Sequence, residues 1–335
     1  MKTLLHRLFN KEKLNYTEAK QTLCNIAQEQ YNPAQIAAFL AVFQLRGIEL
    51  EELKGFRDAL LELCIPVDLS DFDCIDVCGT GGDGKNTFNV STLSAFVIAG
   101  AGYKVAKHGN YGVSSVCGSS NVLEYLGYQF TNNSDQLQQQ LERANICFLH
   151  APLFHPAMKS VAPIRQQLGV KTFFNMLGPM VNPAQPQRQL VGVFDLKLQR
   201  LYNYLYQQGN KQYAIIHALD GYDEVSLTGN FKLVTNEQEQ ILSPQALNLP
   251  QYKAQDLFGG NTIKEAADIF MQVLQGNGTT AQQDVVACNA GIAIQRFEPN
   301  LSLIDCIAKA KETLAKGAAY QAFKSLTMKK ASIIN

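Results

Sequence analysis

Apolar residues in the first 65 positions recur every three or four residues, which is the spacing of helices that bury one face. Thr17 is placed to cap a first helix. Pro33 suits the first turn of a second helix, whose apolar pattern stops at Gly47. A third run covers residues 53–61 and ends before Pro66, because the residue before a proline is pushed out of the helical region. The segment therefore predicts three helices.

Beyond residue 72 the pattern changes to short β-rich runs that end in glycine loops and alternate with helical stretches. Such alternation predicts an α/β domain with a central, mostly parallel sheet flanked by helices. The expected strands are residues 75–78, 104–106, 146–150, 190–194 and 213–218. The expected helices are residues 91–101, 156–168 and 197–208, with a polar hairpin over 224–243 and amphipathic helices from 263 onward. We expect a small all-helical domain over residues 1–70 and a larger α/β domain over residues 71–335.

Composition supports a folded chain and excludes several classes of protein. Of the 335 residues, 46% are hydrophobic, which is enough for a packed core and too much for a disordered chain. The 29 Lys and Arg residues balance 29 Asp and Glu residues, so no net field attracts nucleic acid or an anionic membrane. Eight scattered cysteines without a Cys-x-x-Cys pair favour a reducing compartment over a disulfide framework or a zinc site. We expect a cytoplasmic protein, because charged residues interrupt the N-terminal leucines and no apolar run approaches the roughly 18 residues of a membrane span.

A glycine-rich loop, GTGGDG at residues 79–84, follows directly on the first expected strand and has the backbone freedom of a phosphate-binding nest. The loop also fits the dinucleotide pattern Gly-x-Gly-x-x-Gly, but the next strand ends in Lys104 and Lys107 rather than in an acid that holds a ribose. It fits most of a Walker A loop, but Asn86 stands where a hydroxyl must bind magnesium. A simple connecting turn is a further alternative. Ser91, at the start of the next helix, either caps that helix or contacts phosphate.

Two further loops are expected at the same edge of the sheet, because ligands of open α/β sheets lie beyond the carboxyl ends of the strands. Residues 107–110 (KHGN) and Ser119 bring a cation and small donors, although a surface lysine and a loop histidine would give the same pattern. Asp223 and Glu224 follow another strand and suit magnesium that bridges to phosphate, although solvated acids at a hairpin entrance are an alternative. Arg165 suits either a bidentate pair with a carboxylate or a surface or interdomain salt bridge.

Together these segments make the chain resemble the anthranilate phosphoribosyltransferases over essentially its whole length. The resemblance rests on DVCGTGGD at 76–83, NVST at 89–92, KHGN at 107–110, HPAMK at 155–159, FNMLGP at 174–179 with NP at 182–183, and DE at 223–224. It implies that residues 165–185 join the helical domain and that a homodimer forms through the helical domains. It also implies transfer of a phosphoribosyl group from phosphoribosyl pyrophosphate to anthranilate, with Mg²⁺, in tryptophan biosynthesis.

The resemblance further implies roles for individual residues. The substrates would be bound by Gly79, Gly82, Asp83, Thr87, Asn89, Val90, Ser91, Thr92, Lys107, His108, Gly109, Asn110, Ser119 and Arg165. Within this set Asn110 and Arg165 would contact anthranilate, with Arg165 facing its carboxylate. Mg²⁺ would be held by Ser91, Asp223 and Glu224. Lys107 and the two acids would stabilise the transition state, and no strong general base is required because an aromatic amine is neutral and nucleophilic at pH 7.

Two positions depart from the family's pattern. Tyr111 stands where arginine is common and Asn121 where aspartate is common, so each removes a charge near the expected phosphates. The contacts made by residues 111–115 are therefore left open. The nearest rival function is that of a pyrimidine nucleoside phosphorylase, which uses inorganic phosphate and needs no paired acids for magnesium. An inactive relative that only binds nucleotides or partners is a third possibility.

Overall fold

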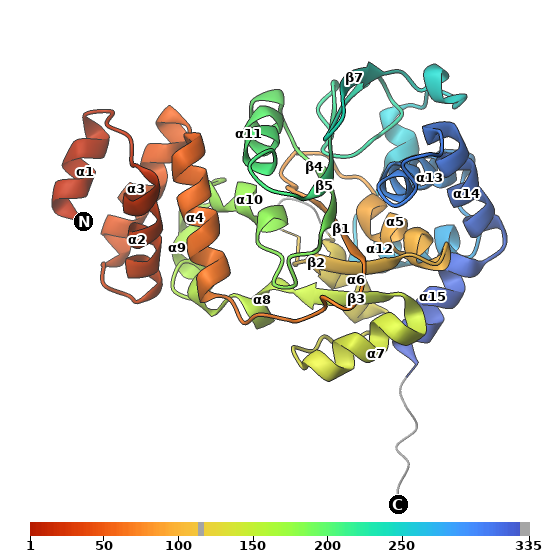
Figure 1. Ribbon diagram of the computed structural model, residues 1–335, viewed down its shortest axis with the longest axis horizontal. Helices are drawn as coiled ribbons and strands as arrows, with labels where there is room; N and C mark the ends of the chain where they lie inside the picture. The colour runs from red at the N-terminus through yellow and green to blue at the C-terminus, as the bar shows by residue number, and fades with distance from the viewer. Residues whose placement is uncertain (113–116, 329–335) are drawn as a thin grey trace, which may run out of the picture.

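The computed structural model describes residues 1–112 and 117–328, and it has a group of helices beside a layered α/β part (Figure 1). Within these residues seven strands form one sheet in the order β3-β2-β1-β4-β5-β6-β7. The first five are parallel, and β6 and β7 add an antiparallel hairpin at one edge. The expected fold class is thus confirmed. The strands are β1 (Cys74–Gly79), β2 (Lys104–Gly109), β3 (Ile146–His150), β4 (Arg188–Gly192), β5 (Gln212–Ala218), β6 (Phe231–Thr235) and β7 (Glu239–Leu242).

The N-terminal segment, all of it described, forms four helices where the sequence pattern predicted three. They are α1 (Lys2–Phe9), α2 (Tyr16–Ala27), α3 (Pro33–Arg46) and α4 (Leu50–Leu63). The unexpected helix α1 is only 8 residues long and depends on burial of Leu5 and Leu8 against its neighbours rather than on propensity. The prediction that Thr17 caps α2 is wrong, because the Asn15 side chain accepts the backbone N–H of Glu18 instead.

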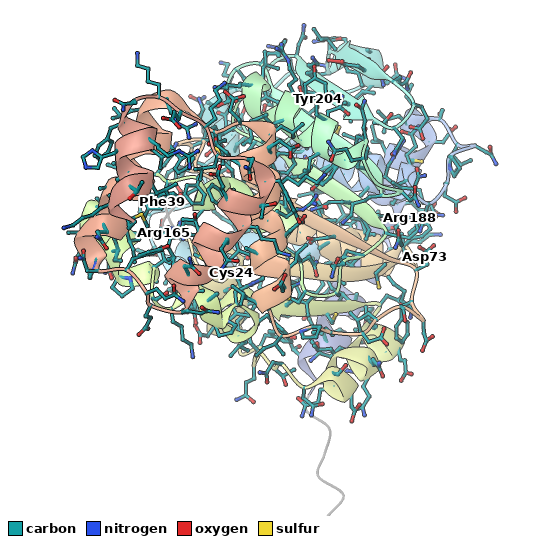
Figure 2. The ribbon with its side chains drawn as sticks, turned by 60° about the vertical axis from the view of Figure 1, so that its left-hand side comes forward. Cys24, Phe39, Asp73, Arg165, Arg188 and Tyr204 are labelled. Atoms are coloured by element: carbon teal, nitrogen blue, oxygen red, sulfur yellow. The ribbon has the colours of Figure 1, made fainter. Side chains whose placement is uncertain are left out.

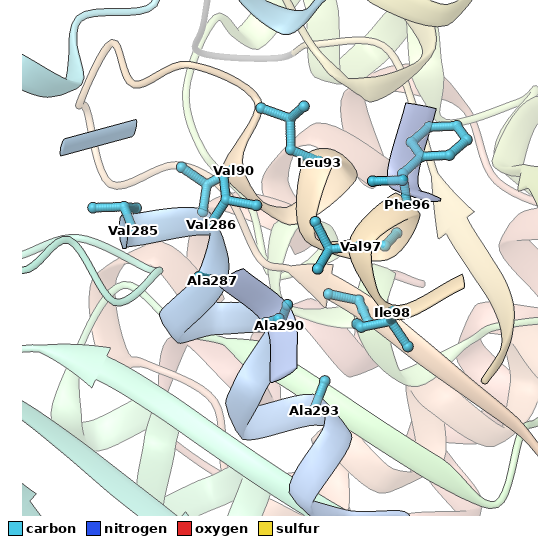
Figure 3. Packing of buried hydrophobic residues seen from close by; sticks show 14 of the residues in the cluster. Val90, Leu93, Phe96, Val97, Ile98, Val285, Val286, Ala287, Ala290 and Ala293 are labelled. Carbon is cyan, nitrogen blue, oxygen red and sulfur yellow. The ribbon is translucent and has the colours of Figure 1, made fainter. Parts of the chain in front are cut away.

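Helices cover both faces of the sheet. On one face α5 (Val90–Gly100) packs lengthwise on α13 (Thr280–Gln295), and their small and branched side chains interlock (Figure 3). Nearly every residue of these two helices is buried, so the pair forms the centre of the larger core. The other helices of the α/β part are α6 (Ser119–Tyr125), α7 (Ser134–Ala144), α11 (Leu196–Tyr206), α12 (Ile263–Leu274), α14 (Leu303–Ala315) and α15 (Ala318–Thr327), with 3₁₀ turns η3 (Gln245–Leu247) and η4 (Ala254–Leu257).

The segment between β3 and β4 consists of short helices, and the single helix expected over 156–168 is wrong. It is replaced by η1 (Pro156–Met158) and α9 (Ala162–Leu168), preceded by α8 (Ala151–Phe154) and followed by α10 (Phe174–Leu177) and η2 (Gly178–Met180). Phe173, between α9 and α10, stacks on Phe56 at 4.4 Å between ring centroids and meets Phe39 and Phe43 edge-on. This segment therefore shares one hydrophobic cluster with α1–α4.

Three strand predictions need correction. The strand expected at 190–194 is β4, which starts two residues earlier because the ladder with β1 extends to polar Arg188 and Gln189. Arg188 forms an ion pair with Asp73, just ahead of β1 (Figure 2). The second strand continues through Lys107 and His108, which were expected to lie in the loop beyond it. The hairpin expected over 224–243 has strands only from Phe231 onward. Within the described residues, no helix is both long and apolar enough to cross a bilayer.

Candidate active site

A cavity of about 280 Å³ lies at the carboxyl ends of the parallel strands. Fifteen of the residues singled out in the sequence line it, from segments that span positions 79 to 224: Gly79, Gly82, Asp83, Thr87, Asn89, Ser91, Thr92, Lys107, His108, Gly109, Asn110, Ser119, Arg165, Asp223 and Glu224. Val90 is not among them, because its side chain is buried in the hydrophobic core behind α5. We name this space the first cavity.

The glycine-rich loop owes its path to three residues with left-handed backbone angles. Gly81, Gly82 and Gly84 have φ values of 62°, 78° and 75°, which side-chain-bearing residues rarely adopt. Two other glycines are needed because another segment of the chain approaches them closely, not because of their backbone φ angles. A Cβ atom on Gly79 would lie 2.5 Å from Oδ2 of Asp223. A Cβ atom on Gly192 would lie 1.5 Å from the backbone oxygen of Asp223. The absence of side chains at the ends of β1 and β4 thus lets the Asp223 segment lie against the sheet.

Three carboxylates gather in the first cavity. Asp223 accepts the backbone N–H of Gly81 at 2.7 Å, and Glu224 accepts that of Ser91 at 3.2 Å. Oδ2 of Asp83 is buried without a partner among the described residues. Burial and the neighbouring charge of Asp83 raise the pKa of Asp223 to about 7, and burial followed by the charge of Asp223 raises the pKa of Glu224 well above its usual value. Clustered acids with raised pKa values form a site that a cation would stabilise.

The start of α5 contributes hydroxyls to the same place. Thr87 donates its hydroxyl to Glu224 at 3.5 Å. Ser91 is the second residue inside α5 and Asn89 stands at the cap position, so the capping alternative for Ser91 is wrong. Asn89 occupies the cap position, but its amide donates to the backbone oxygen of Cys117 at 3.1 Å and so ties α5 to the loop before α6. The hydroxyl of Ser91 is consequently not engaged in holding its own helix.

Lys107 is not the surface lysine that its type alone would suggest. It is 2% exposed, and its ammonium group donates to the backbone oxygen of Val77 on the adjacent strand. A cation that is buried beside the acids and lines the first cavity gives an anionic ligand a strong, poorly screened partner.

His108 is likewise a buried strand residue rather than a loop histidine. Its Nδ1 lies 3.0 Å from the backbone oxygen of Gly178, which can only accept, so Nδ1 carries the proton. Burial lowers the pKa of His108 to about 4, so the ring is neutral at pH 7. Its Nε2 is a buried acceptor without a partner among the described residues. His108 therefore contributes a neutral ring, not a positive charge, to the wall of the site.

Arg165 reaches the site from α9, on the side of the molecule where the N-terminal helices lie (Figure 2). Its Nη2 donates to the side-chain oxygen of Asn175 at 3.3 Å, and its guanidinium lies 5.4 Å from the ring centre of Phe174. Burial lowers its pKa. Within residues 1–112 and 117–328 no carboxylate pairs with it, so the alternative of a surface or interdomain salt bridge fails and the guanidinium is available to a ligand acid.

A second cavity of about 250 Å³ joins the first and was not foreseen from the sequence. His108, Asn110, Arg165 and Phe174 line both spaces. The rest of its wall is mainly apolar and includes Leu60 of α4, Met158, Ala162, Leu177 and Val181. An apolar slot with one arginine and a few polar groups suits a flat aromatic acid.

The two departures from the family's pattern lie at the rim. Tyr111 lines the first cavity, and its ring meets His150 edge-on at 4.8 Å between centroids. Oδ1 of Asn121 accepts the backbone N–H groups of Gly112 at 2.9 Å and Gly118 at 3.0 Å. Asn121 thus replaces an acid without losing the acceptor that this loop uses. Residues 113–115, whose contacts were left open, lie outside the described part of the chain.

Known proteins resemble this chain over nearly its full length. Residues 71–320 match the model of the glycosyl transferase family a/b domain, and residues 2–64 match that of its helical bundle domain. An anthranilate phosphoribosyltransferase of Cytophaga hutchinsonii is 56% identical over 97% of this chain and 99% of its own length. The crystal structure of anthranilate phosphoribosyltransferase from Thermus thermophilus has a TM-score of 0.89 at 32% identity, covering 96% of this chain and 98% of its own. The Saccharomyces cerevisiae enzyme in complex with PRPP and Mg has a TM-score of 0.87 at 26% identity, covering 96% and 95%.

Proposed function

This chain belongs to the anthranilate phosphoribosyltransferases of the glycosyl transferase family, and from that premise we propose which of its residues carry out the transfer. The reaction moves the phosphoribosyl group of phosphoribosyl pyrophosphate to the amine of anthranilate and releases pyrophosphate. The product, N-(5-phosphoribosyl)-anthranilate, is made for tryptophan biosynthesis.

Phosphoribosyl pyrophosphate is assigned to the first cavity. The observation that carries this assignment is that the glycine loop, Lys107 and the paired acids, taken from three segments far apart in the chain, surround one space. Backbone N–H groups of the glycine loop and the hydroxyls of Thr87, Ser91 and Ser119 supply donors for phosphate oxygens. Lys107 supplies a cation whose position is fixed by its bond to Val77.

Mg²⁺ is assigned to the carboxylates of Asp223 and Glu224 with the hydroxyl of Ser91. The donor set fits: these are oxygen ligands, and the unpartnered oxygen of Asp83 beside them adds negative charge that a cation would offset. Among the described residues no three acidic, histidine or cysteine side chains form a metal site by themselves, so water or phosphate oxygens would fill the remaining ligand positions. When bound, magnesium neutralises pyrophosphate and makes it a better leaving group.

The chain's own residues stabilise the charges that separate as the bond from C1 of the ribose to pyrophosphate breaks. Positive charge develops on the sugar and negative charge on the departing pyrophosphate. Lys107 and the N–H groups of the glycine loop stabilise this negative charge from fixed positions. Removing one such fixed group costs on the order of 10² in rate in other enzymes. The amine of anthranilate needs no activation before attack, because it is neutral and carries its own lone pair at pH 7.

Anthranilate is assigned to the place where the two cavities meet. Arg165 binds its carboxylate, and Phe174 and the apolar wall contact its ring. The neutral ring of His108 lies in the same wall and does not compete with Arg165 for the carboxylate. Rate is gained chiefly from holding the amine close to C1 of the ribose.

We further propose a homodimer formed through the helical domain, which comprises residues 1–70 with 165–185 beside the α/β domain of 71–335. Two large apolar side chains support this proposal: Leu45 on α3 is 89% exposed, and Phe9 on the neighbouring α1 is 60% exposed. Large apolar side chains that are exposed on a single chain often mark a surface that a second chain covers. A cytoplasmic location is proposed on the ground that the eight scattered cysteines favour a reducing compartment.

The function is tested by mixing the purified protein with phosphoribosyl pyrophosphate, anthranilate and Mg²⁺ and measuring both pyrophosphate release and the loss of free anthranilate. We expect one pyrophosphate to be released for each anthranilate consumed, and no reaction after chelation of the metal. Glu224→Gln should need more Mg²⁺ for half-maximal rate, whereas Glu312→Gln, on the outer helix α14, should behave as the parent protein. Phosphorolysis of a pyrimidine nucleoside, without pyrophosphate release, would replace the proposed function by that of a phosphorylase.

A further inference from the structure

Lys171 lies outside both cavities, yet it touches the glycine-rich loop that forms the wall of the first. Its ammonium group donates to the backbone oxygen of Gly82, 89 positions earlier in the chain. Its side chain also covers the loop from outside, since a Cβ on Gly82 would lie 3.4 Å from Cε of Lys171. The connection between α9 and α10 is thereby fastened to the phosphate-binding loop.

The partners of Lys171 are a carbonyl and an aromatic ring rather than an acid. Its Nζ lies 5.4 Å from the ring centre of Phe194, which follows β4. Across the described parts of the chain no carboxylate lies within ion-pair distance of it. A hydrogen bond from a charged group to a carbonyl is stronger than one between neutral groups. One cation thus joins the loops that follow β1 and β4 to the segment before α10.

The bond to Gly82 fixes the direction of a donor in the loop. Gly82 has a φ of 78°, and in a trans peptide the N–H of the next residue points opposite to the carbonyl. With the Gly82 oxygen held by Lys171 on the outside, the N–H of Asp83 is turned to the other side of the loop. Asp83 itself lines the first cavity.

A short chain of contacts leads from Lys171 to Arg165. The next residue, Thr172, donates its backbone N–H to Oδ1 of Asn175 at 3.0 Å. The same oxygen accepts Nη2 of Arg165 at 3.3 Å. A shift of the glycine loop that moves Lys171 would therefore also move the group that holds the guanidinium.

We propose that Lys171 is a positioning residue that couples the phosphate-binding loop to Arg165, so that binding of the pyrophosphate group and of the aromatic carboxylate strengthen each other. The identity of the two ligands rests on the proposed function. Coupling of binding is reciprocal, so each ligand must raise the affinity of the other by the same factor. Lys171 needs no contact with either ligand for this effect.

The test uses the intact protein with Mg²⁺-pyrophosphate and anthranilate, which bind together without reacting. The dissociation constant of anthranilate is measured from its own fluorescence, with and without saturating Mg²⁺-pyrophosphate. In the parent protein we expect pyrophosphate to tighten anthranilate binding by about fivefold or more. Lys171→Met should reduce the factor to below about twofold, and Lys171→Arg should restore it. Lys316→Met is the matched control, because Lys316 is an exposed lysine that pairs with Glu312 on α14.

Three outcomes would overturn the proposal. The first is a parent protein in which the two ligands bind independently. The second is Lys171→Met with the parent's coupling factor. The third is Lys171→Met that binds pyrophosphate more weakly but keeps the coupling factor, which would make Lys171 a direct ligand. Failure of the proposed function would be seen separately, as a parent protein that releases no pyrophosphate from the two substrates.

Discussion

The close approach of Gly79 to the side chain of Asp223 gives a sharp prediction for Gly79→Ala. The added methyl group would stand 2.5 Å from Oδ2 of Asp223, about 1 Å closer than ordinary contact. Gly79 does not have a left-handed φ, so alanine fits the backbone itself. The strain must be relieved by moving the Asp223 carboxylate, which also accepts the N–H of Gly81. Overpacking of this kind costs about 1–3 kcal/mol of unfolding free energy.

The effect on activity should be larger than the effect on stability. Displacing a group of the active site by about 1 Å can lower the rate by about 10². We therefore expect Gly79→Ala to lose about 10² in kcat/KM for phosphoribosyl pyrophosphate, and to need more Mg²⁺ for half-maximal rate. Pyrophosphate release at varied Mg²⁺ measures both, and thermal unfolding shows that the variant is folded.

A second glycine provides the control. A Cβ on Gly209, after α11, would meet only the backbone oxygen of Tyr206 at 3.9 Å, which is ordinary contact. Gly209→Ala should retain the parent's kcat/KM and Mg²⁺ requirement. The reasoning is refuted if Gly79→Ala keeps kcat/KM within about threefold of the parent, or if both variants lose activity to the same extent.

The remaining predictions concern the aromatic side of the site and the core behind it. Arg165→Met should raise KM for anthranilate about 10- to 100-fold with a smaller loss in kcat, because it removes a charged hydrogen bond that is present in both the ground state and the transition state. An equal increase in KM for aniline, which lacks the carboxylate, would contradict this role. Burial lowers the pKa values of His108 and His155 to about 4 and about 3, so both must gain protons on unfolding below pH 6.5. The free energy of unfolding is therefore unaffected by these groups above pH 6.5 and decreases as the pH falls toward 4 for His108 and toward 3 for His155, by about 2 kcal/mol for each at pH 5. Urea unfolding of His155→Gln at pH 7 and pH 5 should show a smaller decrease in this free energy than the parent shows. An unchanged decrease would be evidence against a buried neutral ring at position 155. Phe173→Ala should lower the free energy of unfolding in urea by about 3–5 kcal/mol, because it leaves a cavity at the centre of an aromatic cluster. Tyr204→Ala, at a side chain that is 49% exposed, should lower it by about 0.5 kcal/mol or less (Figure 2).

Local sequence was sufficient wherever the signal is local. The proline at the first turn of α3, the glycine at its end and the strand Ile146–His150 were all placed correctly, because each depends on backbone angles or on a short apolar run. The glycine loop and the acids 223–224 could be placed at one sheet edge because parallel strands all end on the same side. Local signals failed for α1, since so short a helix is stable only where its buried leucines find partners.

The residues that sequence reasoning missed are those defined by neighbours far along the chain. Nothing in the type or spacing of Lys171 indicates a bond to Gly82, and nothing near Leu60 indicates that α4 lines the second cavity. Phe174 and Gly178 stood within a family motif, but no role could be assigned to them before their contacts with Arg165 and His108 were known. Such contacts join positions up to about 90 residues apart.

The sequence by itself determined the two kinds of domain, the glycine-rich loop after the first strand and the chemical types of the groups at the site. The tertiary structure alone decided that Lys107 is a buried cation, that His108 is a neutral ring, and that Arg165 lines a cavity without an ion pair to any carboxylate of the described residues. The physical reason is that burial and nearby charges set the protonation and the strength of a polar group. Both depend on which distant segments the fold brings together, and the order of residues does not contain that information locally.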